Sequence, residues 1–121
     1  MATTQVAVAG LGRVGGRFLE ALLEAGVTVA AVAQPGDTPG KAFARAHGIP
    51  VLEDALDLLE LPEVEVLFDL TGSEAVRRRL RERLAARGDT RVVVAPESVA
   101  RLVWQLVAGD RRWPELHSDR Y

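Results

Sequence analysis

Cysteine is absent from this 121-residue chain, so disulfide bridges and thiolate metal sites are excluded. Lysine is almost absent too, because Lys41 is the single lysine among fifteen basic side chains. The net charge of −2 argues against a general nucleic-acid-binding surface. No apolar run approaches the ~20 residues that a membrane-spanning helix requires. We therefore expect neither a nucleic-acid partner nor a membrane partner.

Asparagine is also absent, and Met1 is the only methionine. Low contents of Asn, Cys and Met are typical of proteins from a thermophile, but a GC-rich genome produces much the same bias. The composition leaves both explanations open, and neither of them indicates a function.

The residues that are present indicate one soluble globular domain. Hydrophobic residues make up 48% of the chain and charged residues 26%, and a chain of this length can bury a proper core. The N-terminal stretch "MATTQVAVAG" lacks the basic region of a signal peptide, so we expect a cytoplasmic protein. We expect the domain to span residues 1–109 and a C-terminal tail to span 110–121.

Short apolar runs alternate with amphipathic segments along the whole chain. This alternation predicts an α/β fold with three layers, in which helices cover both faces of a parallel sheet. The unbroken apolar runs "VAVA" and "RVVVA" are typical of strands buried on both faces. We expect a Rossmann-type fold with five strands in the order 3-2-1-4-5. The predicted strands are 5–10, 27–33, 49–53, 64–70 and 91–95, and the predicted helices are 13–26, 38–48, 54–61, 71–88 and 98–109.

The turn after the first predicted strand contains the pattern Gly10-x-Gly12-x-x-Gly15. In a strand–turn–helix unit, the first glycine permits the tight turn and the second lets a pyrophosphate approach the backbone. The third lets the helix pack close to the strand, and the helix N-terminus attracts the phosphates. We predict a site for a phosphate-bearing nucleotide here. The alternative is a glycine-rich turn that serves packing alone.

The acidic residue that usually binds the ribose at the end of strand 2 is missing. Gln34 occupies that place, and it can bond a ribose hydroxyl without repelling a 2′-phosphate. Asp37 could substitute for the acid, or Thr38 and Lys41 could hold a 2′-phosphate. Ordinary turn and cap chemistry explains these residues equally well. The sequence therefore predicts NAD or NADP as the cofactor and leaves the choice between the two open.

The segment "DLTGS" (69–73) follows the fourth predicted strand, at the carboxyl edge where open α/β sheets bind ligands. Thr71 and Gly72 could touch a ribose or the pyrophosphate. Alternatively, Thr71 and Glu74 form a capping box that starts the next helix. Asp69 could orient a polar ligand group or pair with an arginine, and we assign it no catalytic role.

Six arginines lie between Arg77 and Arg87. They could form an anion-binding patch, but the acidic net charge favours a solvated helix face with Glu74–Arg78 and Arg78–Glu82 pairs. His47 and His117 are isolated, so we expect no metal site.

The sequence resembles the N-terminal NAD(P)-binding domain of the glucose–fructose oxidoreductase/inositol dehydrogenase family, and also that of homoserine dehydrogenase. The segments that carry the resemblance are "VAVAGLGRVGGRFLEAL", "HGIPVLEDALDLL" and "VEVLFDLTG". It implies that the three glycines contact the pyrophosphate, that Gln34 faces the adenosine ribose, and that Thr71 and Gly72 face the nicotinamide. It also implies that the backbone of the glycine loop is supplied by Leu11, Arg13 and Val14.

The chain departs from these enzymes in its catalytic parts. The oxidoreductase family carries a Glu-Lys-Pro motif after strand 5, whereas "VAPES" (94–98) has no lysine. We therefore assign no catalytic residue and expect a free-standing NAD(P)-binding domain that acts as a nucleotide- or redox-sensing or regulatory subunit, with a possible protein partner. The alternatives are a minimal NAD(P)-dependent oxidoreductase with a substrate site between subunits, the nucleotide-binding half of a two-chain dehydrogenase, or a module for another nucleotide such as coenzyme A.

The C-terminal segment "SVARLVWQLVAG" (98–109) has an apolar arc wider than one sheet face requires. Trp104 lies at the edge of that arc, and Trp113 and Tyr121 follow in the tail. We expect a homodimer formed through this helix and tail. The alternative is a tail that folds back over the helix of its own subunit.

Overall fold

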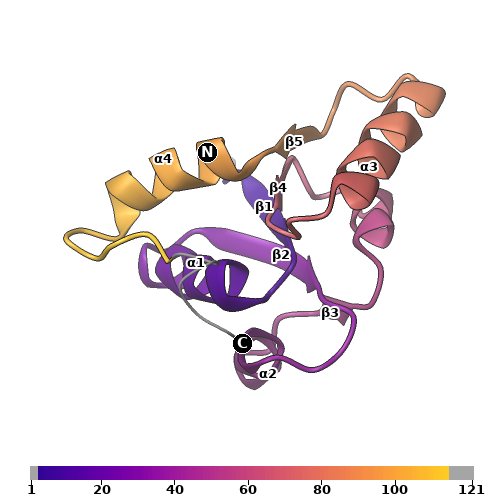
Figure 1. The fold of residues 1–121 in the computed structure, drawn as a ribbon. Coiled ribbons are helices and arrows are strands. Elements are labelled where there is room, and N and C mark those ends of the chain that lie inside the picture. The colour runs from indigo at the N-terminus through magenta and orange to yellow at the C-terminus, as the bar shows by residue number, and fades with distance from the viewer. Residues whose placement is uncertain (1–2, 115–121) are drawn as a thin grey trace.

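The elements of the chain alternate between strand and helix in a computed structural model that describes residues 3–114 (Figure 1). The sheet contains β1 (Gln5–Ala9), β2 (Thr28–Ala33), β3 (Val51–Leu52), β4 (Val66–Asp69) and β5 (Val93–Ala95). The helical elements are α1 (Arg13–Glu24), α2 (Pro39–Ala46), the 3-10 helix η1 (Ala55–Glu60), α3 (Glu74–Arg87) and α4 (Glu97–Val107).

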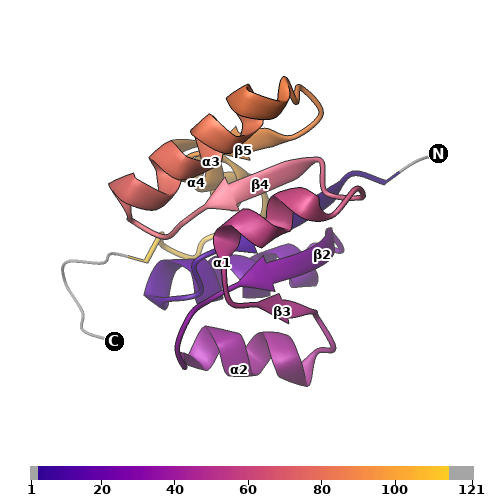
Figure 2. The same ribbon diagram turned by 90° about the vertical axis from the view of Figure 1, so that its right-hand side faces the viewer.

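All strand pairs are parallel, and the strand order is β3-β2-β1-β4-β5. Figure 2 shows β2 beside β3, and β4 on the other side of β1 from β2, with η1 and α3 on the side that faces the viewer. This arrangement confirms the predicted sheet order 3-2-1-4-5 and the α/β class. Because parallel strands all end at one edge, the loops after β1, β2, β3 and β4 converge there.

The two faces of β1 lie in two different hydrophobic cores. Val6 and Val8 pack with α1, α2 and α4, whereas Ala7 and Ala9 pack with η1 and α3. Alternation of side chains along a strand produces this division. Phe18 lies at the centre of the first core, with its ring centroid 4.9 Å from that of Phe68. The sheet is therefore covered by helices on both faces, as three layers require.

Two predicted helices differ from the structure in type or in start. The segment 54–61 forms a 3-10 helix, capped by Asp54 as expected. The capping box of Thr71 and Glu74 is wrong, because Ser73 caps α3 by accepting a hydrogen bond from the Val76 amide. The Thr71 hydroxyl instead donates to Asp69, and Gly72 has a positive φ of 67°. The chain therefore turns once more before the helix begins.

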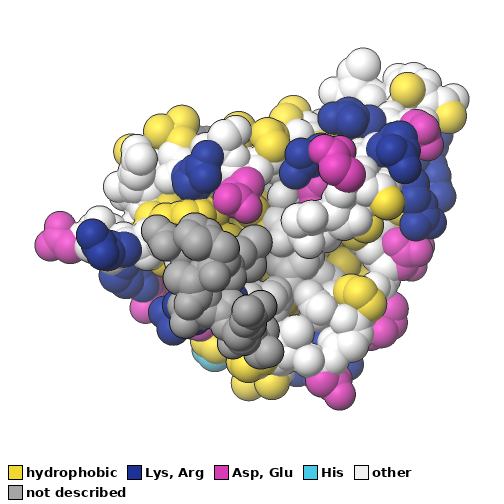
Figure 3. Space-filling view, viewed as in Figure 1, with side chains coloured by type: hydrophobic (Ala, Val, Ile, Leu, Met, Phe, Trp, Pro, Cys, Tyr) yellow, Lys and Arg dark blue, Asp and Glu magenta, His cyan; other side chains and the backbone are white. Residues whose placement is uncertain are grey.

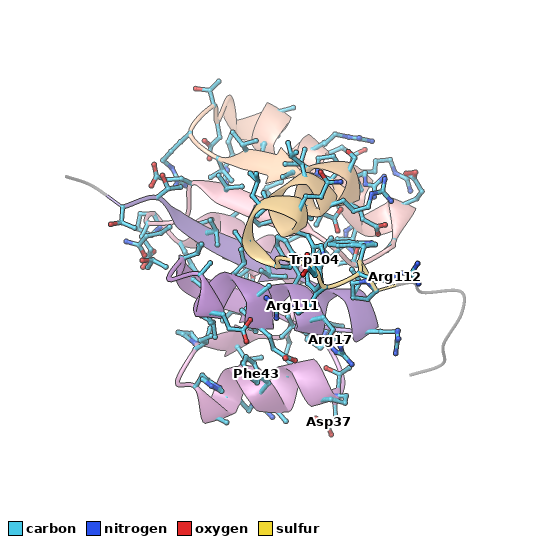
Figure 4. The ribbon with its side chains drawn as sticks, turned by 90° about the vertical axis from the view of Figure 1, so that its left-hand side faces the viewer. Arg17, Asp37, Phe43, Trp104, Arg111 and Arg112 are labelled. Atoms are coloured by element: carbon cyan, nitrogen blue, oxygen red, sulfur yellow. The ribbon has the colours of Figure 1, made fainter. Side chains whose placement is uncertain are left out.

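The C-terminal residues up to Pro114 fold back over α4 of the same subunit. Trp104 is 5% exposed and lies 5.5 Å from Trp113 between ring centroids. Its indole N–H donates to the Arg111 carbonyl, and the Arg111 guanidinium carbon lies 5.6 Å from the centroid of its ring. Figure 4 shows the two labelled residues close together. This packing bears out, for the residues up to Pro114, the alternative in which the tail folds back over the helix of its own subunit, because Trp113 covers Trp104. Tyr121 and His117 lie outside the described residues.

Within residues 3–114, no helix is both long enough and apolar enough to cross a membrane.

Candidate functional site

The glycine loop between β1 and α1 is shaped by two glycines that leave no room for a side chain. Gly10 has φ +91°, and a Cβ there would lie 2.7 Å from the Leu70 carbonyl oxygen. A Cβ on Gly15 would overlap the Gly10 carbonyl oxygen. These contacts hold the first turn of α1 directly against the end of β1. Gly10 and Gly15 therefore make the turn and the close packing that the pattern predicts.

Gly12 differs from its two neighbours because it faces open space. No atom lies within 4 Å of the position that a Cβ would occupy. Gly12 is also the N-cap residue of α1, and no side chain caps that end of the helix. The absence of a Cβ thus serves nothing within the described part of the fold, and it leaves the helix N-terminus open to a ligand.

A cavity of about 600 Å³ opens at this point of the sheet edge. Small-molecule sites in proteins have volumes of about 300–1,000 Å³. The cavity is lined by the glycine loop, the ends of β2 and β3, and the segment that leads into α3. Its lining residues are Gly10, Gly12, Arg13, Val14, Ala33, Gln34, Pro35, Glu53, Asp54, Ala55, Leu70, Thr71, Ser73, Val76 and Arg79.

The structure brings together half of the predicted site residues. The predicted residues that line the cavity are Gly10, Gly12, Arg13, Val14, Gln34 and Thr71. Those that do not line it are Leu11, Gly15, Asp37, Thr38, Lys41 and Gly72. Leu11 is fully buried in the core, and Asp37 lies at the outer end of α2 in Figure 4.

The side chain of Gln34 is turned toward the glycine loop. Its Oε1 accepts a hydrogen bond of 2.6 Å from the Leu11 amide, and its Nε2 donates to the Pro35 carbonyl. The amide therefore braces the loop against the end of β2. One N–H of Nε2 and the second lone pair of the neutral Oε1 stay available for a ligand, whereas an aspartate would offer a ribose a charged acceptor.

Thr38 and Lys41 hold α2 in place. The Thr38 hydroxyl donates to the Leu11 carbonyl and accepts from the Lys41 amide. The Lys41 side chain is buried, and its ammonium lies 2.8 Å from Oε2 of Glu53. This hydrogen bond and the charge of Lys41 lower the pKa of Glu53 below its usual value. A lysine engaged in this way is poorly placed to receive a 2′-phosphate.

Three residues near the cavity have roles that the sequence interpretation missed. Glu53 and Arg79 line the cavity from β3 and α3, and Gly40 lets α2 approach the glycine loop. A Cβ on Gly40 would lie 2.6 Å from the Leu11 carbonyl oxygen. The place of Gly40 inside the predicted helix 38–48 could have indicated this role, because a glycine within a helix is unfavourable unless close packing requires it. Glu53 could have been found from the strand order, which places the end of strand 3 beside the end of strand 2.

The loop after β4 is organised by Asp69, whose side chain is fully buried. Its Oδ1 accepts hydrogen bonds from the amide and the hydroxyl of Thr71, and its Oδ2 lies 3.6 Å from Nε of Arg77. The predicted pairing of Asp69 with an arginine is confirmed. Since Thr71 lines the cavity, Asp69 fixes the position of a wall residue without itself reaching the cavity.

The arginines of α3 lie on a solvated surface with acidic partners, as Figure 3 shows on the right. Arg83 and Arg87 both pair with Glu60 of η1, and Arg77 pairs with Glu74. The predicted pairs of Arg78 with Glu74 and Glu82 are not among the ion pairs of residues 3–114. The solvated-face interpretation is correct, with the 3-10 helix supplying the main anionic partner.

No protein-family model matches the sequence, and no curated protein matches it. Among solved structures, the chain is similar to UDP-N-acetylmuramate:L-alanyl-gamma-D-glutamyl-meso-diaminopimelate ligase from Neisseria meningitides, with a TM-score of 0.59 and 21% identity. The match covers 78% of this chain and 29% of the ligase, so the chain spans less than a third of that protein. At this identity the likeness shows the fold alone, a Rossmann-like parallel α/β domain. The resemblance to the oxidoreductase and homoserine dehydrogenase domains stays a prediction.

Proposed function

We propose that this chain is a nucleotide-binding domain that takes NAD(P) in the cavity at its glycine loop. The observation that carries the proposal is Gly12, which caps α1 and faces open space beside a cavity of about 600 Å³. A diphosphate placed there would meet the free N–H groups and the positive end of α1. Arg13 and Arg79 line the same cavity and would add positive charge beside it.

The proposed role is nucleotide or redox sensing, or regulation of a partner protein, rather than complete catalysis. Lys41 is buried in its ion pair with Glu53, and the loop after β5 contains no lysine. Hydride transfer also needs a substrate held against the cofactor and screened from water. An NAD(P)-binding chain has two alternative functions. It could be the cofactor-binding half of a two-chain dehydrogenase, or an oxidoreductase whose substrate site forms between subunits.

A second candidate ligand is a nucleotide diphosphate joined to a sugar. The ligase that shares this fold is named for UDP-N-acetylmuramate, and a uridine diphosphate offers the same diphosphate group to the glycine loop. The two candidates differ in what lies beyond the diphosphate. They are therefore separated by comparing dinucleotides with UDP-sugars on the same protein.

Calorimetric titration of the full chain tests the proposal. The panel contains NAD⁺, NADH, NADP⁺, NADPH, coenzyme A and UDP-N-acetylglucosamine. We expect binding of at least one NAD(P) form, and its loss in Gly12→Val, whose branched side chain would fill the space that the diphosphate needs. Ala86→Val, on the exposed side of α3, adds the same side chain away from the cavity and should leave binding unchanged. Absence of heat with every dinucleotide at millimolar concentration would refute NAD(P) binding.

We also propose that the chain forms a homodimer through α4. With Trp104 covered by Trp113, the apolar surface that remains comprises Val93, Val99, Leu102 and Leu106, which are 59%, 40%, 56% and 78% exposed. Val99, Leu102 and Leu106 follow a spacing of three and four residues, so they lie on one side of the helix. A stripe of this kind next to the edge strand β5 suits pairing with a second copy.

A further inference from the structure

Recognition of the nucleotide's ribose is the feature of the proposed site that the end of β2 does not explain. Gln34 sits where an acid normally accepts the ribose hydroxyls, yet its Oε1 is used by the Leu11 amide. That oxygen is neutral and keeps a single lone pair, so a charged acceptor for the ribose hydroxyls has to come from elsewhere on the cavity wall. The neighbouring strand in the sheet is β3, which pairs with β2 through Ala33 and Leu52.

Glu53 follows Leu52 directly and lines the cavity together with Gln34 and Pro35. Its side chain is 69% exposed, so the carboxylate is accessible to a ligand. The Lys41 ammonium bonds Oε2 only, and Oε1 makes no hydrogen bond with residues 3–114. We propose that Glu53 accepts the hydroxyls of the nucleotide's ribose, and that it thereby selects NAD over NADP. This inference rests on the proposed function.

The ion pair with Lys41 prepares Glu53 for that role. Lys41 is 4% exposed, and its amide is fixed by the Thr38 cap at the start of α2. A buried ammonium on a fixed helix holds the carboxylate in one orientation and keeps it ionised, in line with its lowered pKa. An ionised carboxylate is the stronger acceptor for a hydroxyl.

The same arrangement disfavours a 2′-phosphate. A phosphate at that position would approach the negative carboxylate of Glu53, with the Asp54 side chain beside it on the cavity wall. Lys41 is 4% exposed, so its ammonium is buried against Glu53 and inaccessible to a phosphate, and Arg45 is the weakest influence on the same carboxylate. Arg13 and Arg79 line the cavity from α1 and α3. We expect the diphosphate on that side of the cavity and the 2′-phosphate of NADP on the side of Glu53.

The experiment compares ligands that differ only by the 2′-phosphate. The full chain is titrated with NAD⁺ and NADP⁺, and with AMP and adenosine 2′,5′-bisphosphate. We expect NAD⁺ to bind about 10-fold tighter than NADP⁺, the gain typical of a hydrogen bond to a charged group. In Glu53→Gln the carbonyl can still accept from Lys41, but the negative charge is gone, so the preference should fall toward 1. The matched control is Glu60→Gln, which removes an arginine-paired carboxylate that is 54% exposed, against 69% for Glu53, and that does not line the cavity.

Each outcome separates this inference from the proposed function. Equal binding of NAD⁺ and NADP⁺ by the unaltered chain, or an unchanged preference in Glu53→Gln, would overturn the role of Glu53 while leaving nucleotide binding intact. Absence of binding by every nucleotide would overturn both. Thermal melting of Glu53→Gln shows whether the variant is folded. If it is unfolded, the NAD⁺/NADP⁺ and AMP/bisphosphate ratios of the unaltered chain decide the question alone.

Discussion

Helices α1 and α3 both begin at the edge of the sheet where the cavity opens, but they are built in opposite ways. Seven of the twelve residues of α1 are buried, whereas Leu80 is the only buried residue among the fourteen of α3. Helix α1 lies between two neighbouring helices, α4 and α2, and contacts both of them (Figure 1). Helix α3 contacts η1 and faces solvent with its arginines.

This difference shows how the two walls of the cavity are fixed in the fold. Its α1 side is fixed by the core, because Gly10, Gly15 and Gly40 lie in positions that leave no room for a Cβ. Its α3 side is attached by the buried Leu80, by the partly buried Val76 and Leu84, and by the pair of Arg77 with the buried Asp69. The other ion pairs of α3 are exposed and contribute little each. Substitutions on α1 therefore change stability and binding together. Substitutions on the exposed side of α3 that do not line the cavity, unlike Arg79, are expected to change neither strongly.

The largest effect is expected at Gly15. Its Cβ would overlap the Gly10 carbonyl oxygen, so Gly15→Ala must move α1 away from β1 and should destabilise the fold by more than about 3 kcal/mol. Gly12→Ala adds the same methyl group into open space and should cost under about 1 kcal/mol. Urea unfolding followed by circular dichroism measures both. Equal losses in the two variants would show that the loop is not rigid.

The next effect tests how α3 is anchored. Leu80 is fully buried in the hydrophobic core that contains Ala7 and Ala9. Leu80→Ala should therefore lower the free energy of unfolding by about 2–5 kcal/mol. Arg78→Ala, two residues away on the exposed surface of the same helix, should cost under about 0.5 kcal/mol. The measurement is the free energy of unfolding from denaturant titration. A small loss at Leu80 would mean that the ion pairs with Glu60 carry more of the attachment than their exposure suggests.

Helix α4 combines the two designs, with a buried side like that of α1 and an exposed side that is apolar instead of charged. Leu106 is 78% exposed, so Leu106→Glu should leave the monomer folded and dissociate the proposed dimer. Trp104→Glu places a charge among Trp113 and the core and should unfold the chain. Light scattering and thermal melting separate the two results. A monomeric unaltered chain at micromolar concentration would contradict the dimer.

The sequence predicted the sheet order and most elements because the strand runs and cap residues are local signals. Gly10 and Gly15 could be assigned their roles for the same reason. The start of α3 was missed because two hydroxyl residues, Thr71 and Ser73, compete for the cap. Only the buried Asp69 carboxylate decides between them.

The position of Trp104 was missed for a different reason. Its cover comes from Trp113, in a segment without periodicity. The pairing of Lys41 with Glu53 was missed because it joins α2 to β3 across twelve residues. Contacts of this kind depend on tertiary structure, so a pattern within one element does not reveal them.

The smallest effect is expected in the pH dependence of stability, and it examines the Lys41–Glu53 pair that links α2 to β3. The pKa of Glu53 is lowered in the folded chain from its ordinary value of 4.5, chiefly by the hydrogen bond from Lys41. A lowered folded pKa means that the pair stabilises the fold fully above pH 4.5, and that this contribution is lost as the pH falls through the folded pKa. Glu53→Gln should therefore melt below the unaltered chain at pH 7, and the gap between their melting temperatures should close in acid.

The control is Glu63→Gln, which removes a carboxylate that pairs with no cation among residues 3–114. The difference between its melting temperature and that of the unaltered chain should not change with pH in this way. Because the Glu53 side chain is mostly exposed, the difference for Glu53→Gln should be small and should shrink further in high salt. A gap that persists unchanged below pH 3 would indicate that the glutamine loses packing around Lys41 rather than charge.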